Sequence, residues 1–186
     1  MVPLMSLWMP ILVSAVLVFL ASSLVHMVLR YHQSDFAKLP QEDQILDALR
    51  PFNVPPGEYM APYCATPAEM KSPAFLEKIK RGPIFSMTVF PTGQWGMGAQ
   101  LAQWFVFIVV VSIFAAYVAG RTLALGTEYI TVFRIAGTVA FASYALGAVP
   151  TSIWYKRKWS TTFKTLFDGL LYGLLTGGAF GWLWPN

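Results

Sequence analysis

The two histidines of the chain are the first residues to consider for chemistry, because imidazole nitrogens bind haem iron and metal ions. His26 and His32 lie at the end of the first apolar stretch. Six residues on one continuous helix correspond to a net rotation of about 240°, so we expect the two rings on different faces. That spacing excludes a haem held by this pair on one helix. A haem held by His26 and a methionine, or by one histidine from each of two chains, stays open, and a structural or interfacial role for both histidines is the favoured interpretation.

Zinc and thiol chemistry have weaker support. The chain has neither a His-Glu-x-x-His motif nor paired cysteines, and we see no second metal ligand near either histidine. Its one cysteine, Cys64, has no base or cation among its sequence neighbours to activate the thiol. We therefore predict no catalytic, cofactor-binding or metal-binding residues, and no cofactor.

Three polar residues fall within or beside apolar stretches: His26, Arg134 and Asp168. Arg134 lies about one turn inside its stretch, so its long side chain can reach water. Asp168 also lies one turn inside, and Lys164, four residues earlier, can pair with it along one helix. Since Arg134 and Asp168 belong to opposite leaflets, we expect anchoring at two surfaces rather than a proton or ion relay.

Four apolar stretches must position these residues. They cover about residues 7–29, 100–120, 130–154 and 163–184, and each has the roughly 20 residues that cross a bilayer core. The chain is 56% hydrophobic and only 12% charged, as membrane proteins are. We predict an all-α integral membrane protein with a single membrane domain, a bundle of four transmembrane helices over residues 1–186. The lipid bilayer is its expected environment, and no nucleic-acid partner is expected.

The last apolar stretch carries a series of glycines at four-residue spacing: Gly169, Gly173, Gly177 and Gly181. In lipid, helices associate by close packing, which bare backbone permits. The preceding stretch has its own series of small residues: Ala136, Ala140, Ser143 and Gly147. We expect these two series to pack together in an antiparallel hairpin of one chain. The alternative is that the glycines join chains, in a homo-oligomer or a larger membrane complex.

The segment from 30 to 98 contains many prolines and charges, so we predict short amphipathic helices outside the membrane. One lies between Pro40 and Pro51, a second begins with the capping box Thr66-Pro67-Ala68-Glu69, and a third covers 72–81.

The parts of this segment between the helices are predicted to be extended. Residues 53–60 are expected to be a rigid connector because of their prolines. Residues 84–90 have the composition of a strand, which must lie at the membrane interface or be covered by other parts of the protein.

The basic residues predict the orientation in the membrane. They concentrate in the loop 30–98 and around the loop 155–162, which we place in the cytoplasm, with both termini in the periplasm. Tryptophans near the predicted helix ends are expected to anchor them at the interfaces: Trp95, Trp104, Trp154, Trp159, Trp182 and Trp184.

Several short motifs along the chain support a resemblance: Gly82-Pro83, Thr88-Val89, Ala116-Tyr117, Trp154-Tyr155, and the run from Asp168-Gly169 to Trp184-Pro185. In these motifs the chain resembles a family of small bacterial inner-membrane proteins with four helices and no assigned activity. The resemblance implies that location and helix number, and it implies no mechanism and no functional residue.

These features favour a non-enzymatic accessory or assembly subunit that acts through helix packing. The alternative is a small oligomeric transporter or channel lined by the glycine-bearing helices, although charge is lacking at the midplane. A membrane redox or enzyme subunit that uses His26, His32, Asp35 or Cys64 ranks last.

Overall fold

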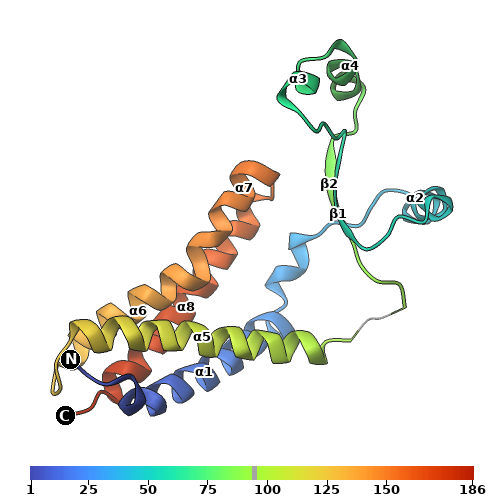
Figure 1. Cartoon of the computed structure of the whole chain (residues 1–186). Helices are drawn as coiled ribbons and strands as arrows, with labels where there is room; N and C mark the ends of the chain where they lie inside the picture. The colour runs from blue at the N-terminus through green and yellow to red at the C-terminus, as the bar shows by residue number, and fades with distance from the viewer. Residues whose placement is uncertain (94–95) are drawn as a thin grey trace. The chain divides into compact units, whose positions relative to one another are not determined.

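The computed structural model describes residues 1–93 and 96–186, which form two compact units (Figure 1). Unit 1 combines Met1–Ala37 with Gly96–Asn186, and unit 2 is Lys38–Trp95. This division falls close to the limits of the loop predicted to lie outside the membrane. Trp95, an expected interfacial anchor, lies outside the described residues.

Unit 1 is helical. Its N-terminal part contains α1 with short helical turns on either side: η1 (Leu4–Leu7), α1 (Trp8–Ser23), the π-helical turn η2 (Leu24–Val28) and the 3-10 turn η3 (Tyr31–Asp35). Its C-terminal part contains the remaining long helices: α5 (Gly98–Thr122), α6 (Tyr129–Ala145), η5 (Leu146–Ala148), α7 (Val149–Tyr155) and α8 (Trp159–Trp182).

Three helical stretches of the described chain are long and apolar enough to cross a membrane: Leu4–Val28, Gly98–Thr122 and Tyr129–Tyr155. They coincide with the first three predicted spans and indicate a membrane protein. The predicted fourth span coincides with α8, which is long enough at 24 residues but is not among the three. Its threonines and glycines, together with Lys164 and Asp168, make it less apolar.

The helices α6 and α8 lie side by side and run antiparallel (Figure 1). A Cβ added at Gly169 would lie 2.6 Å from the Cβ of Ala145, near the end of α6. One added at Gly181 would lie 2.7 Å from the ring of Tyr129, at the beginning of α6. The glycine series of α8 therefore packs against α6 of the same chain along the whole helix.

The α6 side of this interface differs from the expected series of Ala136, Ala140, Ser143 and Gly147. The residues that meet the glycines are spaced by four and are mostly large: Tyr129, Phe133, Gly137, Phe141 and Ala145. Ala136 instead joins a buried core with alanines of α5, Ser143 is exposed, and Gly147 has open space around it. The reason is that α6 has two neighbours: its small face meets α5, and its rings fill the space above the bare backbone of α8.

A break separates α6 from α7 at residues 146–148. Pro150 has no N–H to donate to the carbonyl four residues earlier, so the α-helix cannot continue through it undisturbed. The hydroxyl of Thr151 donates to the carbonyl of Ala148 at 2.6 Å and occupies one of the backbone acceptors at the break.

Both chain ends lie where α5 ends and α6 begins (Figure 1). The backbone N–H of Val2 donates to the carbonyl of Gly120 at 2.7 Å. At the other terminus, the indole N–H of Trp184 donates to the carbonyl of Ala124 at 2.9 Å, and the N–H of Gly126 donates to Pro185 at 2.9 Å. The two termini therefore share one end of unit 1.

Unit 2 contains an antiparallel pair of strands, β1 (Gly57–Ala61) and β2 (Phe85–Val89), with Gly57 opposite Val89 and Ala61 opposite Phe85. This pair corrects two expectations: the fold is mostly helical rather than all-α, and part of the expected connector is the partner of the expected lone strand.

The helices of unit 2 are short: α2 (Glu42–Leu49), α3 (Pro67–Met70) and α4 (Pro73–Arg81). They begin near the predicted starts, and the Thr66 hydroxyl accepts from the N–H of Glu69 at 3.2 Å, as in a capping box. None of the described residues of unit 2 is buried.

Candidate functional site

The chain turns back on itself directly after the first apolar helix. The π-helical turn η2 contains His26, and such turns are rare and often occur at functional sites. Arg30 then adopts a left-handed conformation with φ of 53°, so η3 folds back instead of extending the helix. The expectation that His26 and His32 face different directions assumed a continuous helix and is wrong. Their rings stack with centroids 4.5 Å apart and an angle of 6° between the planes.

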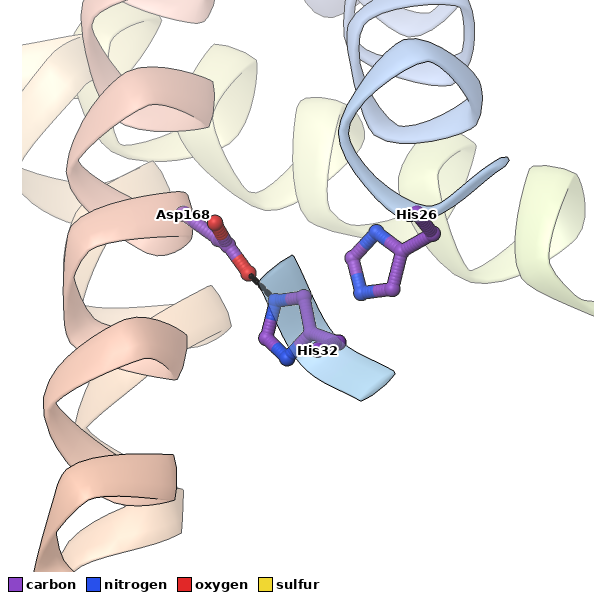
Figure 2. A group of neighbouring side chains, drawn as sticks. All are labelled: His26, His32 and Asp168. Atoms are coloured by element: carbon purple, nitrogen blue, oxygen red, sulfur yellow. Dashed lines mark hydrogen bonds and ion pairs between the residues drawn. The ribbon is translucent and has the colours of Figure 1, made fainter. Parts of the chain in front are cut away.

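His32 lies between two carboxylates. Figure 2 shows it beside Asp168 of α8, with 2.7 Å between Nε2 of the ring and Oδ2 of Asp168. The other ring nitrogen, Nδ1, lies 2.7 Å from Oδ2 of Asp35. Both ring nitrogens of His32 thus lie at hydrogen-bond distance from a carboxylate oxygen, one on each side of the ring.

Lys164 binds η3 rather than Asp168. Its Nζ donates to the carbonyl of Tyr31 at 2.7 Å, to the hydroxyl of Ser34 at 2.7 Å and to Oδ1 of Asp35 at 2.8 Å. The predicted pair of Lys164 with Asp168 is therefore wrong, because the lysine turns away from its own helix to reach a buried carboxylate. We call the four connected charged residues the polar latch: His32, Asp35, Lys164 and Asp168.

The electrostatics of the polar latch balance within a small volume. The side chains of Asp35 and Asp168 are each only 6% exposed. Burial alone would raise the pKa of Asp35, but the hydrogen bonds from Lys164 and His32 outweigh it and lower the pKa to about 2. Each carboxylate of the polar latch has a nitrogen-bearing partner within 2.8 Å, which offsets the cost of removing these groups from water. The polar latch thereby ties η3 to the first half of α8.

Two atoms at this site have unused binding capacity. Oδ1 of Asp168 is buried and has no hydrogen-bond partner within the described chain. Nδ1 of His26 lies 3.0 Å from the carbonyl oxygen of Ser22, which can only accept. Nδ1 therefore carries a proton, and in the neutral ring Nε2 has a free lone pair. One ligand atom from each of His26, His32 and Asp168 lies within 4.8 Å of the others. The expectation that no second metal ligand lies near either histidine is therefore wrong.

His26 is the member of this group that borders a groove. A groove of about 220 Å³ lies along this residue, and its walls include Met27, Met97 and Trp104. The indole N–H of Trp104 donates to the hydroxyl of Ser22 at 2.9 Å, which holds the groove wall in place. His26 is exposed, whereas Asp168 is buried.

The other candidate residues have simpler surroundings. Arg134 is exposed on α6 and takes part in none of the ion pairs found among residues 1–93 and 96–186. It borders a shallow groove between α6 and α8 together with Gly137 and Gly173. Cys64 belongs to unit 2 and is a partly exposed free thiol.

Comparison with protein-family models, with curated proteins and with solved structures gave no match to this chain.

Proposed function

We propose that the protein is a membrane-embedded accessory or assembly subunit that binds a partner protein through unit 2. The observation that carries this proposal is the exposure of apolar side chains on α2, where Ile45, Leu46 and Leu49 are 36%, 42% and 40% exposed. These residues share one face of an amphipathic helix, and such a face ordinarily covers apolar surface of something else.

The charges of α2 favour a protein over a lipid surface as the occupant of this face. Amphipathic helices that bind anionic membranes are rich in lysine and arginine. In contrast, α2 carries Glu42, Asp43 and Asp47, and residues 38–93 contain equal numbers of acidic and basic side chains. Anionic headgroups would repel the acids of α2, whereas a protein partner can supply complementary charge.

The arrangement of unit 1 supports a fourth span formed by α8. This helix accompanies α6, part of a membrane-spanning stretch, from Tyr129 to Ala145. A helix that lies antiparallel along a span over this length passes through the same bilayer, and four crossings return the chain to the side from which it started. The loops 30–98 and 155–162 contain most of the basic residues, so we place them in the cytoplasm and both termini in the periplasm of a bacterial inner membrane.

The alternative of an oligomeric pore receives no support from this geometry. A pore lined by the glycines of several chains needs those glycines to be free, but α6 of the same chain already covers them. The observation that favours a second candidate, a metal-bearing subunit, is the cluster of His26, His32 and Asp168.

The partner proposal is tested by photo-crosslinking in the intact membrane. A photoreactive amino acid replaces Leu46 in the full-length chain in one strain and Gln44 in a second. Gln44 is the matched control, because two residues along a helix correspond to a rotation of about 200°, which places it on the opposite side of α2 from Leu46, and it is also exposed. We expect a discrete protein adduct from position 46 and none from position 44. Adducts to lipid alone, equal adducts at both positions, or none at position 46 would contradict the proposal, and an adduct of twice the chain mass would identify the partner as a second copy.

A further inference from the structure

We propose that His26, His32 and Asp168 bind one divalent transition-metal ion of the Zn²⁺ class. Their three ligand atoms lie within 4.8 Å of one another, at the point where η2, η3 and α8 meet (Figure 2). Two imidazole nitrogens and one carboxylate form the kind of ligand set found in zinc sites that keep an open position and in non-haem iron sites. This inference is independent of the partner-binding proposal, because it uses none of the residues of unit 2.

The ion replaces a proton between His32 and Asp168. Without metal, Nε2 of His32 donates to Oδ2 of Asp168 across 2.7 Å. On binding, this proton passes to the solvent, and the lone pairs of Nε2 and Oδ2 both bind the ion. Ligands at 2.0–2.1 Å from tetrahedral zinc lie about 3.3 Å apart, so this separation widens by roughly half an ångström.

His26 completes the ligand set by a side-chain movement. The ring belongs to an exposed residue beside a groove, so a rotation about its side-chain bonds can bring Nε2 onto the ion. One ligand atom of the ring already lies within 4.8 Å of the ligand atoms of His32 and Asp168, so the movement is small.

Hydrogen bonds behind both histidines already have the arrangement that metal-binding histidines require. A ligating imidazole donates its second N–H to a carboxylate or a backbone carbonyl, which fixes the tautomer and orients the ring. Nδ1 of His32 faces Asp35, which is itself held by Lys164. Nδ1 of His26 faces the carbonyl of Ser22. In both rings Nε2 is thus the nitrogen available to a metal ion.

The buried carboxylate supplies an independent observation that points to a ligand. The side chain of Asp168 is only 6% exposed, yet its Oδ1 has no hydrogen-bond partner within the described chain. A buried, charged oxygen without a partner is costly, and an ion or an ion-bound water at this position would satisfy it. Three protein ligands also leave at least one position on the ion for water or another small ligand.

The test is Zn²⁺ binding by the full-length protein in detergent, purified with a tag that contains no histidine and stripped of metal with a chelator. Isothermal titration gives affinity and stoichiometry, and elemental analysis after gel filtration gives the retained metal. We expect one Zn²⁺ per chain in the unaltered protein, and binding about tenfold or more weaker in His26→Ala and in Asp168→Asn. Cys64→Ser is the matched control, because it removes the one thiol, and it should bind like the unaltered protein.

A second measurement separates lost binding from lost folding. The ring of His26 makes one hydrogen bond, to backbone, and a stacking contact, so metal-free His26→Ala should keep the helical circular dichroism and melting temperature of the unaltered protein. Added Zn²⁺ should raise the melting temperature of the unaltered protein and not that of His26→Ala. The proposal is overturned if the unaltered protein retains no Zn²⁺, or if both ligand variants bind and respond as it does. Neither result would alter the crosslinks from position 46, so the two proposals fail separately.

Discussion

The helix α8 is held in two regions by different kinds of interaction. From Gly169 to Gly181 it approaches α6 closely because the glycines have no side chains there. Directly before this region, Lys164 and Asp168 bind η3 through polar contacts. The first region is held because glycine has no side chain, which lets the two helices approach. The second is held by specific polar groups on Lys164 and Asp168.

The difference shows how a small membrane protein can combine a rigid part with a chemically responsive one. In the packed region, any added atom meets backbone or ring atoms of α6, so the two helices have little freedom to separate or approach. In the polar region, the side chains of His32 and Lys164 are 17% and 22% exposed, so solvent reaches these groups. The packing of α6 and α8 thereby gives the buried Asp168 a fixed position.

The largest effect is expected from adding one methyl group to the packed region. In Gly177→Ala the new Cβ would lie 2.7 Å from the backbone carbonyl oxygen of Phe133, so the helices must move apart. Overpacking of this kind should lower the free energy of unfolding by about 2–3 kcal/mol. The measurement is thermal or denaturant unfolding in detergent.

The neighbouring glycine provides the control for this change. A Cβ at Gly178 would lie 3.7 Å from the hydroxyl of Tyr129, which is an ordinary contact. Gly178→Ala should therefore leave stability unchanged or raise it slightly, since alanine favours a helix. Equal effects at positions 177 and 178 would show that close packing is not what holds this part of α8.

The pairing of the last two long helices could be predicted from sequence, but its details could not. Glycines at four-residue spacing on Gly169 to Gly181 indicated a face for close packing, and α6 covers that face. The partner residues on α6 were missed because we matched small residues with small ones. From the sequence alone, an aromatic residue such as Phe133 is expected to face lipid. In the structure, Phe133 packs against Gly177, where the backbone of α8 has no side chain.

The polar latch could not be predicted because the sequence analysis placed His26 and His32 on one continuous helix, whereas the chain turns back between them. Nothing in the residue types marks the π-helical turn or the left-handed Arg30, since arginine rarely adopts positive φ. One feature did point to the latch. Asp168 is the only acid in the last apolar stretch, and a buried carboxylate needs a cationic partner from the same end of the bundle. His32 and Lys164 both met this condition.

An intermediate effect is expected from breaking the polar latch. Lys164→Met keeps most of the length of the side chain but removes three hydrogen bonds and leaves the buried Asp35 with one partner fewer. We expect η3 to open locally at a cost of about 1–2 kcal/mol, while the packing of α6 and α8 persists. Hydrogen exchange of residues 31–35 measures this opening.

Lys156→Met is the control, because Lys156 is exposed and makes only a long contact of 3.4 Å to the carbonyl of Ile153. It should leave the exchange of residues 31–35 unchanged. If Lys164→Met increased hydrogen exchange throughout α8, the glycine-packed region and the polar region would unfold together. That result would contradict the distinction between the two regions.

The smallest effect is expected where two helices meet through neutral hydroxyl groups. Ser14 of α1 donates to the hydroxyl of Ser112 in α5 at 3.1 Å, and both residues are fully buried. The hydroxyl of Ser14 also lies 3.0 Å from the carbonyl of Ile11, so it keeps an acceptor when Ser112 is replaced by alanine. A double-mutant cycle of Ser14→Ala and Ser112→Ala should give a coupling of about 0.6 kcal/mol.

The corresponding cycle of Lys164→Met and Asp35→Asn should give a larger coupling, because charged partners bind more strongly in a buried setting. If the serine pair were coupled as strongly as the charged pair, burial within unit 1 rather than charge would account for the strength of the polar latch.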